Sequence, residues 1–201
     1  MGCGVGFTTE LIAGIVDLLD VVEGSRSFIE KAKGRNLPNV RFYHALFEEF
    51  NPRRNYYDAV FAMWVLEHVQ DPAQVLRIAH LALKPDGLLF VVVPNANALS
   101  RQLARHMGLI EDLKSLTEND LRHGHRRVYD RVSLNRELTQ AGFTLVSQGG
   151  LMLKPFADFQ MEQLIRQRIL EEPQLEGLWS LGFEYPDLCG SLYAICSPSQ
   201  V

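Results

Sequence analysis

Apolar, aromatic and β-branched residues gather in four short runs along the first half of the chain, at residues 16–22, 40–44, 57–63 and 88–93. Runs of this length and composition are typical of buried strands. Between them, apolar residues recur with helical spacing. We expect helices at residues 7–15, 25–33 and 71–83, and a turn at 84–87. Strands that alternate with helices indicate an α/β fold with a doubly wound, mostly parallel sheet.

The pattern changes after residue 97. A short basic helix is predicted at residues 98–107, and the following residues, 108–127, are polar and irregular. Long irregular segments in compact domains are usually lids or binding loops, so we expect a lid over residues 98–128. The later pattern predicts helices at 134–141 and 156–171 and strands at 143–148 and 188–196. These two strands would form an antiparallel hairpin at the edge of the sheet.

A glycine-rich segment, Gly2-Cys3-Gly4-Val5-Gly6, precedes the first predicted helix. Glycines let the backbone turn tightly and let a ligand approach its N–H groups. A helix that begins directly after them offers free amide donors to an anionic group. Glu23 ends the next predicted strand, where an acid can accept hydrogen bonds from ribose hydroxyls. The order of loop, helix, strand and acid predicts a nucleotide-cofactor site.

Composition narrows the possible classes. The 201 residues carry a net charge of −4, which argues against a nucleic-acid partner because there is no broad positive field. Three cysteines without CxxC spacing argue against a disulfide framework and fit a reducing, cytoplasmic compartment. No apolar run reaches the ~18 residues that a membrane span needs.

The segments at the carboxyl ends of the predicted strands should meet in one crevice, because ligands of parallel sheets bind at that edge. These segments are Glu23 and residues 45–48, 63–68 and 94–97. A series of motifs follows in order along the chain: Gly2 to Gly6, Glu23, Leu46-Phe47-Glu48, Tyr57 to Val60, Val65 to Val69, Leu83 to Gly87, Val93-Pro94-Asn95 and Ala141-Gly142-Phe143. In their order and spacing, these motifs resemble the class I S-adenosylmethionine-dependent methyltransferases, and most closely the ubiquinone-biosynthesis-like O-methyltransferases.

The resemblance covers most of the chain and implies a Rossmann-like sheet in the order 3-2-1-4-5-7-6, with strand seven antiparallel. Strand one normally precedes the glycines, but here only Met1 does. We therefore expect that the polypeptide starts upstream or is truncated, or that another segment fills the gap. The single methyltransferase domain, 1–201, would comprise a cofactor-binding half (1–97), the lid (98–128) and a C-terminal half (129–201).

The resemblance also implies S-adenosylmethionine as the methyl donor and S-adenosylhomocysteine as the product. It places the following residues at the cofactor: Gly2, Cys3, Gly4, Gly6, Glu23, Gly24, Ser25, Leu46, Phe47, Glu48, Met63, Trp64 and Val65. We interpret Cys3 as a small space-filling residue and not as a reactive thiol.

Three histidines are the candidates for catalysis. His68 can titrate near neutral pH and act as a general base, or it can simply shape the pocket. His123 and His125 alternate on the lid and would face the same way on an extended segment. Glu67 and His68 also suggest a metal, because some relatives bind a divalent ion through Glu-x-x-Glu-His. Trp64 stands at the first of these positions, so we expect no metal.

A basic cluster on and beside the lid is the candidate acceptor site. With Asn95, the residues Arg101, Arg126 and Arg127 would bind an anionic group such as a phosphate or carboxylate. The alternative interpretation is a solvated basic face.

The leading hypothesis is methyl transfer to an oxygen of a small, anionic molecule by a monomer or homodimer. The alternatives are an RNA or N-methyltransferase and a non-catalytic cofactor-binding module. A dinucleotide-dependent oxidoreductase fits less well, because Gly6 arrives one residue early for G-x-G-x-x-G and Phe7 holds the later place.

Overall fold

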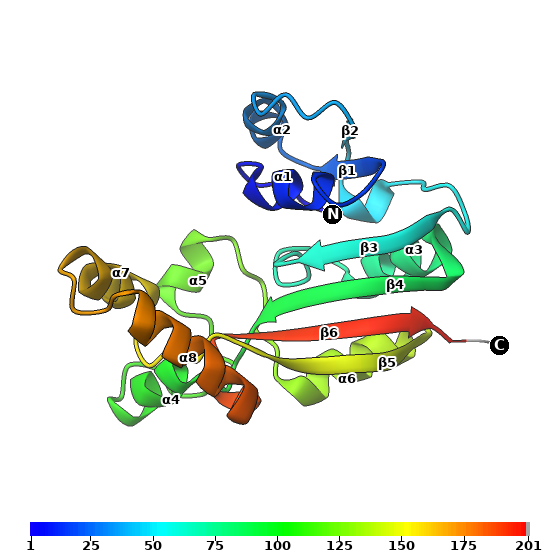
Figure 1. Cartoon of the computed structure of the whole chain (residues 1–201). Coiled ribbons are helices and arrows are strands. Elements are labelled where there is room, and N and C mark those ends of the chain that lie inside the picture. Colours follow the sequence, from blue (N-terminus) through cyan, green and yellow to red (C-terminus); the bar gives the residue numbers. More distant parts are fainter. Residues whose placement is uncertain (200–201) are drawn as a thin grey trace.

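The computed structural model describes residues 1–199 and shows an α/β fold with two sheets (Figure 1). Strands β1 (Leu19–Glu23) and β2 (Val40–His44) pair in parallel. A second, mixed sheet has the order β3-β4-β6-β5, in which β3 and β4 are parallel and β6 is antiparallel to both of its neighbours. Its strands are β3 (Tyr57–Met63), β4 (Leu83–Pro94), β5 (Phe143–Leu151) and β6 (Ser191–Pro198).

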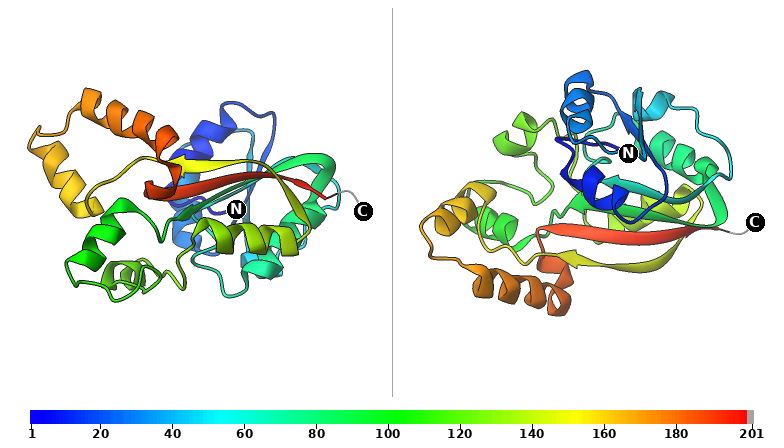
Figure 2. Two further views of the ribbon diagram at one scale, coloured as in Figure 1. Left: turned by 90° about the horizontal axis from the view of Figure 1, so that it is seen from below. Right: turned by 45° about the horizontal axis from the view of Figure 1, so that its top comes forward.

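Helices surround these sheets and extend beyond one end of them (Figures 1 and 2). They are α1 (Phe7–Ala13), α2 (Arg26–Lys33), α3 (Pro72–Ala82), α4 (Leu99–His106), α5 (Glu118–Arg122), α6 (Arg131–Gln140), α7 (Asp158–Arg166) and α8 (Glu172–Glu184), with short 3-10 helices at Phe47–Glu49 and Pro186–Leu188. Helices α3 and α6 contact each other on one face of the four-stranded sheet, whereas α4, α5 and α7 lie past its end. Among residues 1–199, no helix has the length and apolar composition that crossing a bilayer requires.

The main core lies between the four-stranded sheet and the pair α3 and α6. Alternate residues of β4 point into it, with Leu89 and Val91 almost fully buried. Leu76 from α3 and Leu138 from α6 pack against them and are also fully buried. Burying a side chain of this size contributes roughly 1.5–3 kcal/mol. This layer therefore fixes the carboxyl ends of β3 and β4.

The two sheets meet at the start of the glycine segment. The main-chain nitrogen of Met1 donates to Phe61 O at 2.7 Å, and Gly2 N donates to Val22 O at 2.8 Å. Tyr57 also donates through its hydroxyl to Asp20, 2.7 Å away. Two separate sheets are observed here, so the seven-stranded order stays a prediction.

Three predicted boundaries are wrong. The first strand begins at Leu19 and not at Val16. The Val16 carbonyl accepts a hydrogen bond from the Asn39 side chain rather than from a neighbouring strand. Residues 84–87 are not a separate turn but the irregular part of β4, where its pairing with β3 shifts from Leu83 to Leu88. The irregular part of the lid contains the short helix α5, which a Thr117 capping box begins.

The helix predicted at residues 156–171 is shorter, because only α7 lies within that range, and a second helix that was not predicted, α8, follows it. Arg168 has a φ of 57°, a left-handed conformation that ends α7. Pro173 then stands in the first turn of α8, where its missing N–H costs nothing. This break separates α7 from α8, and α8 then packs against β5.

Candidate active site

The glycine segment forms a tight loop that leads into α1. Gly2, Gly4 and Gly6 all have positive φ, at 74°, 47° and 93°. The φ of Gly6 favours glycine, and an added Cβ would lie 2.8 Å from Nε of the Arg35 side chain, which would have to shift. Gly2 lies against Val65 and Phe47, which brings the loop next to the ends of β3 and β2. The sequence prediction of a glycine loop before a helix is confirmed.

Glu23 at the end of β1 holds this loop. Its side chain is buried, and one oxygen, Oε2, accepts a hydrogen bond from Cys3 N at 3.0 Å. The other oxygen, Oε1, accepts from Ser25 N at 2.8 Å. Burial, reinforced by the nearby Glu23 charge, raises the pKa of the Cys3 thiol to about 12. The thiol is therefore neutral, which agrees with Cys3 as a space-filling residue.

A cavity of about 1030 Å³ runs along the loop, between β1 and β3, and reaches the ends of these strands. Its lining includes the predicted cofactor residues Gly2, Cys3, Gly4, Glu23, Phe47, Met63, Trp64 and Val65, together with His68 and His123. The lining also runs along β1 and β3 as far as Lys84, so only the part of the cavity beside the glycine loop corresponds to the predicted cofactor site. Leu46 is half-exposed beside Gly24, and Glu48 accepts from Gln70 N at 2.9 Å.

Trp64 directly follows β3 and adopts an unusual backbone conformation, with a φ of 53°. Its indole nitrogen donates to Ser191 Oγ at 3.3 Å, and 45% of the residue is exposed. Left-handed conformations of bulky residues cost ~1–3 kcal/mol and cluster at ligand sites. Trp64 also forms part of the cavity wall.

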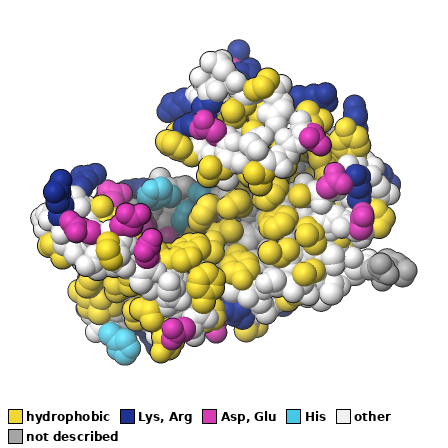
Figure 3. Space-filling model, in the orientation of Figure 1, with side chains coloured by type: hydrophobic (Ala, Val, Ile, Leu, Met, Phe, Trp, Pro, Cys, Tyr) yellow, Lys and Arg dark blue, Asp and Glu magenta, His cyan; other side chains and the backbone are white. Residues whose placement is uncertain are grey.

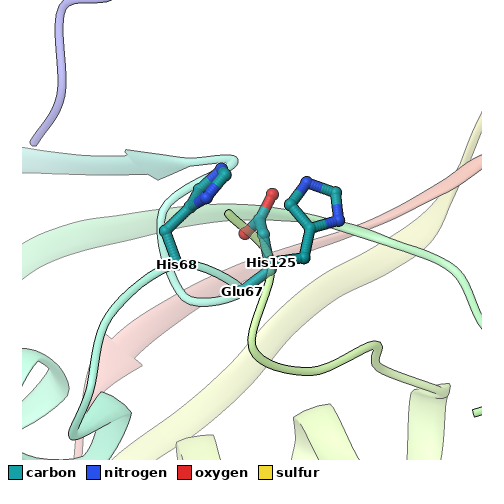
Figure 4. Close-up of side chains that lie close together, drawn as sticks. All are labelled: Glu67, His68 and His125. Carbon is teal, nitrogen blue, oxygen red and sulfur yellow. The ribbon is translucent and has the colours of Figure 1, made fainter. Parts of the chain in front are cut away.

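Glu67, His68 and His125 come together beside the cavity (Figure 4). The His68 and His125 rings meet edge to face, with centroids 4.8 Å apart. Glu67 is fully buried, and among residues 1–199 neither of its carboxylate oxygens has a hydrogen-bond partner. Burial raises the pKa of Glu67 to about 7, and burial together with the nearby His125 lowers that of His68. His123 is exposed, with its ring 6.1 Å from that of His125.

Asp120 joins separate segments of the lid to one another. Its carboxylate accepts hydrogen bonds from Thr117, from Arg101 at 3.0 Å and from His125 Nδ1 at 3.1 Å. Arg101 also donates to the carbonyls of Leu113 and Ser115. Arg101, which we expected to contact the acceptor, is thus used to hold the lid.

Arg127 and Asn95 likewise have structural partners. Arg127 donates to the carbonyls of Leu66, Val69 and Gln70 and clamps the segment between β3 and α3. The Asn95 amide donates to the carbonyls of Asp187 and Cys189. Arg126 is exposed and donates through Nε to His68 O at 3.0 Å. Arg126 is consequently the member of the predicted acceptor set best placed to meet a ligand.

Sequence reasoning missed two residues of this region. Glu67 was considered only as part of a broken metal motif, although a Glu-His pair directly after a strand is a usable signal. Asp120 has no such signal, because its partners Arg101 and His125 meet it only when the lid is folded. Figure 3 shows histidine side chains in the hollow between the lid and the body of the molecule.

Comparison with known proteins agrees with this geometry. Residues 1–148 match the family model described as a methyltransferase domain. A ubiquinone biosynthesis O-methyltransferase of Bradyrhizobium diazoefficiens is 30% identical over 161 residues, which cover 79% of this chain and 62% of that protein. An N-terminal Xaa-Pro-Lys N-methyltransferase 1 of Ailuropoda melanoleuca is 29% identical over 63% of this chain and 56% of that protein. The chain thus spans less than two thirds of the length of these curated relatives.

Solved structures share the fold. An S-adenosylmethionine-dependent methyltransferase from Mesorhizobium loti matches with a TM-score of 0.68 and 15% identity over 98% of this chain and 88% of that one. A DhpI–SAH complex matches with a TM-score of 0.58 and 20% identity over 99% of this chain and 74% of that one. The family match over three quarters of the sequence, the glycine loop and Glu23 lead to one conclusion: the chain belongs to the methyltransferase-domain family and has the fold of S-adenosylmethionine-dependent methyltransferases.

Proposed function

We propose that the protein transfers the methyl group of S-adenosylmethionine to an oxygen of a small molecule. The observation that carries this proposal is the buried Glu23 carboxylate, held by Cys3 N and Ser25 N at the mouth of the glycine loop. A carboxylate at the end of this strand is placed to accept hydrogen bonds from the cofactor ribose. The cavity that follows the loop would hold the rest of the cofactor.

The protein's part in this reaction is mainly binding and orientation, because the sulfonium of the cofactor already carries an activated methyl group. Trp64, His68 and His123 line the cavity beside the segment that follows β3, so we place the acceptor there. The catalytic roles of His68, His123 and His125 stay predictions. Arg126, exposed next to His68, is the candidate contact for an anionic group on the acceptor.

The cofactor part of the proposal is tested by calorimetry with S-adenosylhomocysteine. Glu23→Gln should weaken binding by roughly 10-fold or more, because hydrogen bonds to a charged group contribute about 1.5–3 kcal/mol. Glu30→Gln on the exposed side of α2 is the matched control and should bind normally. Equal affinities of the two variants would contradict the assignment of Glu23.

The oxygen acceptor is supported by the ubiquinone O-methyltransferase relatives, but the Xaa-Pro-Lys N-methyltransferase relative makes nitrogen the second candidate. A panel of catechols, phenols and Xaa-Pro-Lys peptides, assayed with labelled S-adenosylmethionine, separates the two. Transfer to the hydroxyl compounds supports the proposal. Transfer to the peptides alone would replace it with N-methylation.

A further inference from the structure

Arg35 follows α2 and contacts the glycine segment and α1, which lie with α2 in the upper part of Figure 1. Its Nε donates a hydrogen bond to Val5 O at 3.2 Å. Its guanidinium forms an ion pair with Glu10 and lies over the Phe7 ring, with Cζ 4.0 Å from the ring centroid. One side chain from another element therefore contacts both the end of the glycine segment and the first turns of α1.

Helix α1 is short and only partly packed against the rest of the molecule. It has seven residues, and its N-cap, Gly6, provides no side-chain hydrogen bond. Isolated helices of this length are marginal in water. The buried residues of α1 are Thr9 and Ala13, whereas Phe7 is 66% exposed. Arg35 therefore holds the start of α1, and Asn39, which donates to Ala13 O at 2.9 Å, holds its end.

The glycine segment is held from two sides. On one side Glu23 accepts a hydrogen bond from Cys3 N, and on the other side Arg35 donates to Val5 O. Residues 2–4, next to these two contacts, line the cofactor part of the cavity. Among residues 1–199, the lining does not include Arg35. Arg35 therefore acts on the cofactor site through the loop and not by touching a ligand.

We propose that Arg35 is a positioning residue for cofactor binding: it holds the glycine segment and the start of α1 in the conformation that receives S-adenosylmethionine. A guanidinium is planar, always charged and stacks on aromatic rings, so one arginine bonds a carbonyl and a carboxylate and covers a ring at the same time. Lysine is a point charge on a flexible stem and cannot make all three contacts. This role rests on the proposed function, because it concerns the same cofactor site.

The proposed role differs from a general contribution to stability. The side chains of Arg35 and Glu10 are 22% and 50% exposed. Ion pairs at the surface contribute little to folding. A loop that is ordered in only a fraction of the molecules, however, lowers the apparent ligand affinity by that fraction. We therefore expect changes at Arg35 to alter cofactor affinity much more than the urea midpoint of unfolding.

The test is calorimetry with S-adenosylhomocysteine on the full chain. Arg35→Ala should weaken binding by roughly 10-fold or more, which corresponds to an ordered loop in about a tenth of the ligand-free molecules. Arg35→Lys should lie between Arg35→Ala and the parent, since lysine can keep only the ion pair with Glu10. Arg131→Ala at the start of α6 is the matched control and should bind as the parent does. Arg131 also pairs with a carboxylate, that of Asp187, and its side chain is 25% exposed.

Two further measurements separate positioning from a loss of folding. Hydrogen exchange of the ligand-free protein should be faster at residues 5–13 in Arg35→Ala, while its urea midpoint should stay close to that of Arg131→Ala. Phe7→Leu should weaken S-adenosylhomocysteine binding in the parent but add little in Arg35→Ala, because the ring and the guanidinium act as one contact.

Three results would overturn the role of Arg35. These are parental affinity in Arg35→Ala, equal weakening in Arg131→Ala, and unchanged hydrogen exchange at residues 5–13. A parent chain that bound no S-adenosylhomocysteine would contradict the proposed function and this role together. A parent chain that bound it, with Arg35→Ala binding equally well, would overturn the role of Arg35 alone.

Discussion

The surroundings of Glu23 and Glu67 can be compared directly, because both carboxylates are buried near the carboxyl end of a strand. Glu23 accepts two main-chain hydrogen bonds within its own loop region. Glu67 accepts none in the described chain and faces two imidazoles instead. The two buried acids therefore differ in the hydrogen bonds that their carboxylates accept.

The difference shows how each region is built. The region around Glu23 is complete within the first 25 residues, and its main chain already provides the donors that the carboxylate needs. The region around Glu67 is assembled only when the lid brings His125 to it. A complete set of local hydrogen bonds favours a fixed cofactor platform, whereas the surroundings of Glu67 depend on how the lid folds.

The largest effect should come from the residue that places His125. Asp120 and Arg101 form an ion pair of side chains that are only 10% and 14% exposed. Removing one member of a buried pair costs ~3–5 kcal/mol, so Asp120→Ala should lower the free energy of unfolding by about that amount. Urea denaturation measures this change.

Glu118→Ala in the same helix removes an exposed carboxylate and should change stability by less than about 1 kcal/mol. If the two variants were equally stable, the lid would not be held by Asp120, and the contrast with the Glu23 region would disappear.

A smaller effect is expected on the Glu23 side, at Gly6. Its φ of 93° and the 2.8 Å approach of Arg35 Nε to an added Cβ make any side chain strained. Gly6→Ala should lower the free energy of unfolding by ~1–3 kcal/mol and weaken S-adenosylhomocysteine binding, because the loop must open.

Gly177→Ala is the matched control for this change. Gly177 lies inside α8 with open space around it, so alanine should stabilise the helix by up to ~1 kcal/mol. A Gly6→Ala protein with parental stability and cofactor affinity would show that the loop is not the rigid platform described here.

The same contrast explains which features could be predicted from the sequence. The glycine loop, β3 and Glu23 depend on neighbours close in the chain, so periodicity and turn chemistry were enough to place them. The pairing of Arg101 with Asp120 and the meeting of His125 with Glu67 depend on how the lid folds back. Spacing along the chain carries little information about such contacts.

The positive charge of an arginine did not by itself show what its side chain binds. Arg101 and Arg127 were expected to bind an anion. Instead, Arg101 donates hydrogen bonds to main-chain carbonyls of the irregular lid, and Arg127 donates to those of the segment after β3. These carbonyls have no partner in a helix or sheet. The helix predicted at 156–171 extended past the true end of α7, which the left-handed Arg168 marks, and α8, whose first turn contains Pro173, was not predicted.

Asp130 is a third carboxylate that can be compared with Glu23 and Glu67. The effect expected at Asp130 is the smallest of those described. It caps α6, accepts from Ser133 N at 2.7 Å and pairs with Lys114 at 2.7 Å. Burial alone would raise the pKa of Asp130, but Lys114 and Ser133 outweigh it and lower the pKa to about 2. Because the pKa is lower in the folded protein, this stabilisation is present above about pH 4 and is lost as the pH falls toward 2. Its full size is about 2 kcal/mol.

The measurement is the free energy of unfolding at about pH 5 and about pH 2.5, in the parent and in Asp130→Asn. Asparagine can still cap the helix but cannot titrate, so the stability of the variant should fall less between these two values. Asp158→Asn, an exposed partner of Lys154, serves as the control and should follow the parent. If Asp130→Asn lost as much stability as the parent on acidification, the contacts with Lys114 and Ser133 would not be what lowers the pKa of Asp130.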